Sequence, residues 1–207
     1  ADHIAKMASA KNAQAAAVAA EWGHSELTTK AAIDAYLASE VAASTLVAQP
    51  IDITGAKGEI YQNVGDINET KEGLPNGLYK VTVNAFSRIT YNPAALDDET
   101  RGIYMPNASL YANGQEIQLY SPYEQTSTSA TAWSDATPAD VVLAGNYIPN
   151  NTTSAEKAFE AGNYKNEIYV YVTDGKLKFG IYKAGKVGNG DWLYYNNFTV
   201  TGYFSAA

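Results

Sequence analysis

The fold is decided by residues 168–181, which read IYVYVTDGKLKFGI. Apolar side chains occupy every second position on both sides of the pair Asp174-Gly175, as in strands that bury one face. The residues that share this face are Ile168, Val170, Val172, Leu177, Phe179 and Ile181. An Asp-Gly pair between two alternating runs is typical of a β-hairpin. We therefore predict a hairpin in which a single register buries both runs.

The same alternation predicts further strands along the chain. Residues 78–89 alternate over one long strand, and residues 109–119 offer two short strands on either side of Asn113-Gly114. Residues 193–203 alternate again and close the chain. Many short strands with no helices alternating between them indicate an antiparallel sandwich and not a parallel sheet.

The front of the chain has a different composition, because alanine dominates it and proline is absent. Apolar residues at helical spacing predict a first helix of about twenty residues that ends at Gly23. Thr28 or Thr29 could cap a second helix, and the two helices would form an antiparallel hairpin. We therefore divide the chain into a helical hairpin or bundle fragment, residues 1–49, and a β-sandwich, residues 50–207.

Charge and composition exclude several classes of protein. The 207 residues carry a formal net charge of -8, which argues against a nucleic-acid partner. The absence of cysteine excludes a disulfide scaffold, a thiolate metal site and a cysteine nucleophile. The longest weakly polar stretch, residues 13–20, is too short for a transmembrane segment. The chain opens at Ala1 without a signal region, so we expect a fragment or mature form from which any targeting segment has been removed.

The sequence contains no evident catalytic constellation. Its two histidines, His3 and His24, lie in the helical region at no metal-ligating spacing. Asp97, Asp98 and Glu99 are adjacent acids, which more often form a solvated or cation-binding loop tip than the carboxylate pair of a glycosidase. We therefore expect no enzyme, although a pair of carboxylates from distant strands stays open as an alternative.

Aromatic content is the most distinctive feature, with 16 Tyr and 3 Trp beside many Asn residues. Sugars present apolar ring faces flanked by hydroxyl groups, so an aromatic platform edged by amides and Arg suits them. The alternative is that most tyrosines cover the sheets. The candidates that lie in or beside irregular stretches or next to a strand end are Trp133, Tyr123, Tyr91, Trp192 and Arg88. Arg88 could donate a fork of hydrogen bonds to vicinal hydroxyls or a uronate, or form a structural ion pair.

Five segments together resemble a known family. They are LPNGLYKV at 74–81, ASLYANG at 108–114, AFEAGNYKN at 158–166, GKLKFGI at 175–181 and DWLYYNNF at 191–198. In this order they resemble the galactose-binding-domain-like β-sandwich that recurs in cell-surface and secreted proteins of gut anaerobes that degrade polysaccharides. The resemblance implies a mainly β, antiparallel jelly-roll sandwich, preceded here by an N-terminal α-helical hairpin, and a short helix near residues 155–160.

The resemblance also implies a structural calcium ion near the sandwich edge, where the family carries an Asp-Asn-Phe. This chain has Asn196-Asn197-Phe198 there, which removes one charged ligand. Asp97 and Asp98 are oxygen donors that suit the same hard cation. We therefore name Asp97, Asp98 and Asn196 as the candidate calcium ligands.

These observations predict a non-catalytic glycan-binding module. We expect an extracellular or cell-surface protein whose partners are a glycan or polysaccharide and other domains of a larger surface protein. The alternative is a structural or adhesive spacer module with no sugar ligand.

Overall fold

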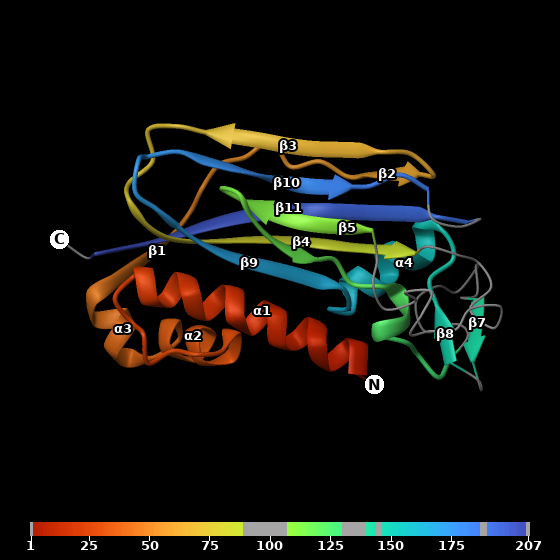
Figure 1. Ribbon diagram of the computed structural model, residues 1–207, viewed down its shortest axis with the longest axis horizontal. Helices are drawn as coiled ribbons and strands as arrows, with labels where there is room; N and C mark the ends of the chain where they lie inside the picture. The colour runs from red at the N-terminus through yellow and green to blue at the C-terminus, as the bar shows by residue number, and fades with distance from the viewer. Residues whose placement is uncertain (1, 89–106, 130–139, 144–145, 187–189, 206–207) are drawn as a thin grey trace.

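The computed structural model describes residues 2–88, 107–129, 140–143, 146–186 and 190–205 (Figure 1). These residues form two antiparallel sheets that pack face to face. The first sheet has the order β1 (Leu46–Pro50), β11 (Trp192–Ser205), β4 (Gly77–Arg88) and β9 (Lys165–Val172), and β2 (Gly58–Tyr61) also pairs with β11. The second sheet has the order β3 (Gly65–Lys71), β10 (Leu177–Lys183), β5 (Ala108–Ala112) and β6 (Gln115–Gln118). The prediction of a mainly β antiparallel sandwich is confirmed.

The main core lies between the two sheets. Tyr79, Val81 and Val83 of β4 are fully buried and share this core with Leu110 of β5 and Ile181 of β10. All six inward-facing residues of the 168–181 segment belong to it as well. The alternation in the sequence therefore identified the buried face of the strands correctly.

The predicted hairpin across Asp174-Gly175 is wrong. Strand β9 pairs with β4 in the first sheet, whereas β10 pairs with β3 and β5 in the second. The link between them crosses from one sheet to the other, and Gly175, at φ +73°, accepts a hydrogen bond from the Leu74 N–H. Alternation fixes which residues face inward but not which strand is the neighbour, because runs on opposite sheets bury their side chains in the same core.

The second predicted hairpin is confirmed. Strands β5 and β6 pair across Asn113 and Gly114, which both have positive φ, at 47° and 80°. These angles suit the tight two-residue turn that Asn-Gly favours. The closing strand is confirmed too, with Phe198 and Val200 buried in the core. A further two-stranded pair consists of β7 (Asp140–Leu143) and β8 (Asn146–Ile148).

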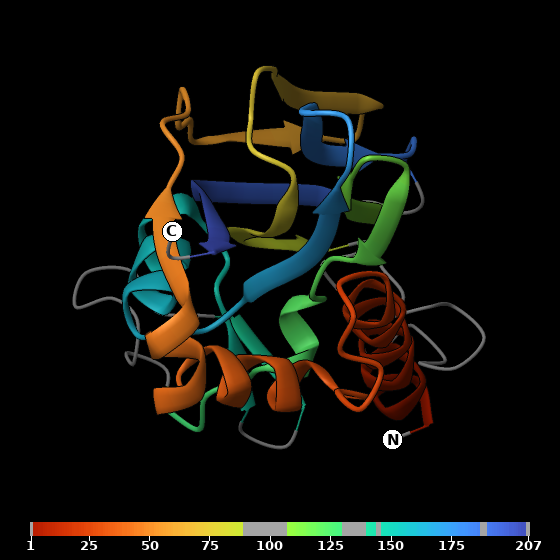
Figure 2. The same ribbon diagram turned by 90° about the vertical axis from the view of Figure 1, so that its left-hand side faces the viewer.

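Helices cover the outer face of the first sheet (Figures 1 and 2). Helix α1 (Asp2–Glu21) ends before Gly23, at φ +93°, and α2 (Lys30–Leu37) is capped by Thr29, as predicted. Helices α1 and α2 pack on Leu78 and Tyr169, which point outward from β4 and β9. At the other end of the same face, α4 (Thr152–Glu160) packs on aromatic side chains of β4 and β11. In the part of the chain that the structure describes, no helix is long and apolar enough to span a bilayer.

The chain continues from α2 through α3 (Glu40–Thr45) directly into β1. Strand β1 pairs with β11 over its whole length, so the last residues of the helical region already belong to the first sheet. The division into residues 1–49 and 50–207 stays a prediction.

A network of charges fastens α2 to the first sheet. Lys30 of α2 lies 2.9 Å from the Glu167 carboxylate, and Lys80 of β4 lies 2.5 Å from it. Both lysines also contact Asp34, which accepts a hydrogen bond from the Tyr169 hydroxyl. The Glu167 side chain is only 11% exposed, so these contacts are screened less than surface pairs.

Val170→Asp should unfold the sandwich, because it places an unpaired charge in the main core, where Val170 is 1% exposed. We expect a loss of more than about 4 kcal/mol in the free energy of unfolding, measured by urea denaturation. The matched control is Val64→Asp, since Val64 is 63% exposed and should tolerate the same change. A stable Val170→Asp variant would contradict the inward orientation of β9.

Glu167→Gln should destabilise the protein at neutral pH but not in acid. Burial alone would raise the pKa of the Glu167 carboxyl, but hydrogen bonds and charges from Lys80 and Lys30 outweigh it and lower the pKa. A carboxyl whose pKa is lowered by folding stabilises the protein above its unfolded pKa, and this contribution disappears as the pH falls through the folded pKa. We expect a loss of about 1–3 kcal/mol at pH 7 that shrinks at pH 3, measured by urea denaturation at both pH values. An equal loss at both would contradict the role of the charge.

Candidate functional site

A pocket of about 280 Å³ lies at one end of the first sheet, on its outer face. Its lining residues are Glu59, Tyr61, Arg88, Asn150, Asn151, Thr152 and Trp192. The floor is a row across three neighbouring strands, because Trp192 of β11 pairs with Tyr61 of β2 on one side and with Arg88 of β4 on the other. Side chains directly opposite each other on neighbouring strands lie close together, so the row forms one continuous surface.

The inner part of this row is rigid. Trp192 is 4% exposed, and its indole N–H donates to Oε2 of Glu59 at 2.7 Å. Arg88 is 2% exposed, its guanidinium carbon lies 4.9 Å from the Trp192 ring centroid, and its Nε donates to the Gly190 carbonyl at 3.1 Å. Phe86 contacts the Trp192 ring edge-on. These contacts fix the floor before any ligand arrives.

The outer part of the row faces solvent. Tyr61 is 44% exposed, the largest exposed fraction among the tyrosines of the described chain together with Tyr182. Glu59, two residues earlier on β2, is exposed as well. Tyr61 therefore supplies the accessible aromatic ring of the pocket, and Glu59 supplies its carboxylate.

The start of α4 forms the wall of the pocket. Asn151 caps the helix by accepting from the Ser154 N–H at 2.9 Å, and its amide donates to the Asn150 side chain at 3.0 Å. Farther along, the Tyr194 hydroxyl of β11 donates to Glu156 at 2.7 Å, which ties the helix to the sheet. Burial and this hydrogen bond raise the pKa of Tyr194, so its hydroxyl remains a neutral donor at physiological pH.

A buried ion pair holds the strand ends that carry the pocket. The Lys183 ammonium at the end of β10 lies 2.7 Å from the Asp191 carboxylate, and both side chains are completely buried. Lys183 also donates to the Asn63 carbonyl at 3.1 Å, and the Asn107 amide donates to Asp191 at 3.0 Å. The Asp191 carbonyl accepts from the Gln62 N–H at 3.0 Å, which fixes the end of β2 beside the start of β11.

The structure brings two of the five predicted ligand-binding residues together. Arg88 and Trp192 line the same pocket. Tyr123 lies in the 3-10 turn Pro122–Glu124, is 6% exposed and does not line it. Tyr91 and Trp133 lie outside the described residues.

Sequence reasoning missed Tyr61 and Glu59. The signal was present as alternation over residues 58–61, in which Ile60 packs against the core between the two outward residues. A run of four residues is too short to be separated from a loop by periodicity alone.

The calcium site stays a prediction. Asp97 and Asp98 lie outside the described residues, and the Asn196 side chain accepts from the Asn84 amide at 3.1 Å. Among the residues that the structure describes, no group of three or more His, Asp or Glu could hold a metal ion. Glu59 is also the one carboxylate among the described residues that line the pocket, whereas glycoside hydrolysis uses two.

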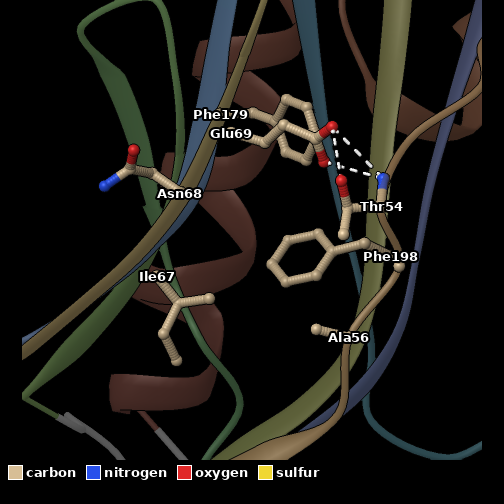
Figure 3. Close-up of a pocket in the computed structure, with 8 residues that line it drawn as sticks. Thr54, Ala56, Ile67, Asn68, Glu69, Phe179 and Phe198 are labelled. Atoms are coloured by element: carbon tan, nitrogen blue, oxygen red, sulfur yellow. Dashed lines mark hydrogen bonds between the residues drawn. The ribbon is translucent and has the colours of Figure 1, made fainter.

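A second, smaller pocket of about 180 Å³ opens between the sheets (Figure 3). Its apolar walls include Phe179 and Phe198, which are 2% and 8% exposed and belong to the main core. Glu69 is its carboxylate, and it accepts from the Thr54 N–H at 3.0 Å and from the Thr54 hydroxyl at 3.1 Å. Lys71 lies 3.1 Å from the same group. These polar groups already satisfy one another, so this pocket is the weaker candidate for a polar ligand.

Fold and site together define a mainly β protein of two packed antiparallel sheets, with a helical layer and a pocket on the outer face of one sheet. No family model matches the chain, and no curated protein matches it. One solved structure similar to it is described as "EclA C-terminal domain; sugar-binding protein". It is 16% identical, the match covers 72% of this chain and 80% of that one, and the TM-score is 0.34. A likeness at this level carries no argument about ligand or reaction.

Asp191→Asn should lower the free energy of unfolding by about 3–5 kcal/mol, because it leaves the buried Lys183 ammonium without its counter-charge. Urea denaturation followed by circular dichroism measures the change. The double variant Lys183→Met, Asp191→Leu should lose less, since it removes both charges at once. Wild-type stability of Asp191→Asn would show that the pair does not hold this end of the sandwich.

Proposed function

We propose that the chain is a non-catalytic module that binds a glycan in the pocket on the outer face of the first sheet. The observation that carries the proposal is the composition of that pocket: an exposed aromatic ring, Tyr61, stands beside a carboxylate and two side-chain amides. Sugars need this combination, because their ring faces are apolar and their edges carry hydroxyl groups.

In this proposal the apolar face of a sugar ring stacks on Tyr61, and its hydroxyl groups bond to Glu59 and to the amides of Asn150 and Asn151. Trp192 and Arg88 support the floor and offer only their small exposed edges. The pocket volume of about 280 Å³ lies at the lower end of the range for ligand sites, so it suits a short saccharide or a chain end.

We retain in this proposal the predictions from the sequence about the type of sandwich, the location of the protein and the contact residues. The sandwich would be of the galactose-binding-like, jelly-roll type, in a cell-surface or secreted protein of polysaccharide utilisation. Tyr91 and Trp133 remain proposed contacts, whereas Tyr123, which is 6% exposed and does not line this pocket, remains one only for a glycan that extends beyond it. A structural calcium ion held by Asp97, Asp98 and Asn196 remains a proposal too. The alternative is a structural or adhesive spacer that binds no sugar.

Tyr61→Ala should weaken glycan binding by roughly tenfold or more, because lost stacking of about 1.5 kcal/mol corresponds to that factor. The measurement is a broad glycan array in calcium-containing buffer, followed by titration calorimetry on each positive glycan. The matched control is Tyr182→Ala, since Tyr182 is also 44% exposed but lies on β10 in the second sheet.

The outcomes separate the two functions. Binding of one glycan class that Tyr61→Ala weakens and Tyr182→Ala leaves unchanged supports the module and its site. Glycan binding that neither variant weakens would show that the glycan binds at another place on the protein. No binding to any glycan would favour the spacer.

A further inference from the structure

Glu59 is the charged group that the pocket presents to a ligand. Its side chain is exposed, and its orientation is fixed because Oε2 accepts the Trp192 indole N–H at 2.7 Å. Within the described chain, its second carboxylate oxygen has no hydrogen-bond partner. A fixed carboxylate with one open oxygen accepts a hydrogen bond from a hydroxyl group of a ligand.

Among the described residues, neither Arg88 nor Lys57 forms an ion pair with the Glu59 carboxylate. Arg88 lines the pocket but is 2% exposed and lies against the Trp192 ring, so its guanidinium is held within the floor. Lys57, the residue before β2, lies 3.2 Å from Glu156 of α4 and is paired with that carboxylate.

The N-terminus of α4 attracts anionic ligands and so opposes the repulsion by Glu59, but its partial charge is smaller. A helix N-terminus carries roughly half an elementary positive charge and attracts anions. Here the end is already closed, because Asn151 and Ser154 cap it reciprocally. A full carboxylate charge on Glu59 therefore outweighs what the helix end leaves exposed.

We infer that Glu59 makes this pocket selective for uncharged glycans and against uronates. A hydroxyl group donates to the open oxygen of Glu59, whereas a uronate carboxylate in the same place meets a like charge and brings no proton to donate. The inference rests on the proposed glycan-binding function, and it assigns Arg88 to the support of the floor instead of the uronate contact expected from its residue type.

The test compares neutral and acidic sugars of the same size. The probes are β-1,4-linked tetrasaccharides of glucose, galactose and mannose, each with a counterpart oxidised at C6 to the uronate, titrated by calorimetry at pH 7. We expect the neutral form to bind roughly tenfold more tightly than its uronate. Glu59→Gln should reduce this ratio by about threefold or more through tighter uronate binding, since Gln keeps an acceptor for Trp192 but removes the charge.

Glu116→Gln is the matched control, because Glu116 is also an exposed strand carboxylate but lies on β6 in the second sheet. It should leave the neutral-to-uronate ratio unchanged, which separates a local effect from the net charge of the protein. Equal or tighter binding of the uronates, or a ratio that Glu59→Gln does not change, overturns this inference and leaves glycan binding standing. Failure of all six probes together with a blank glycan array overturns both.

Discussion

The buried ion pair between Lys183 and Asp191 joins the two sheets at the end where the pocket lies. Lys183 ends β10 in the second sheet, and Asp191 precedes β11 in the first. Two charges out of water are stable only when further hydrogen bonds satisfy them, and here the Asn63 carbonyl and the Asn107 amide do so. Ser87 of β4 donates to the same Asn107 side chain, so strands of both sheets converge on one polar cluster. The geometry of the sandwich end depends on this cluster.

The floor of the candidate site is rigid because this polar cluster holds the residues next to it. Trp192 follows Asp191 directly, and the Arg88 side chain bonds to the carbonyl of the neighbouring Gly190. The two largest side chains of the floor are therefore held from below, and Tyr61 and Glu59 on the short strand β2 are left to face solvent. A ligand that binds there loses little free energy to the ordering of the floor side chains, because these side chains are already held in place in the free protein.

Burial could be predicted from the sequence far better than pairing. Alternation identified the inward residues of β4, β9 and β10 because it is a local consequence of the pleat. It could not show that the strands flanking Asp174-Gly175 belong to different sheets, since that depends on contacts with distant strands. The buried ion pair of Lys183 and Asp191 could not be predicted for a related reason. A charged residue indicates an exposed position unless its partner is known, and here the partner lies on the opposite sheet.

The helical layer decides where on the first sheet a ligand can reach. Helices α1 and α2 cover one end of its outer face through Leu78 and Tyr169, and α4 covers the aromatic side chains of β4 and β11 toward the other end. Strand β2 pairs with only the first four residues of β11, beside the start of α4. The row formed by Trp192 and Tyr61 therefore reaches the edge of the area that α4 covers. Trp192 is buried under the helix, and Tyr61 lies outside it and is exposed to solvent. Helices that contribute nothing to the main core thus shape the accessible part of this face beside β2, and the pocket there depends on how α4 is capped and tied to Tyr194.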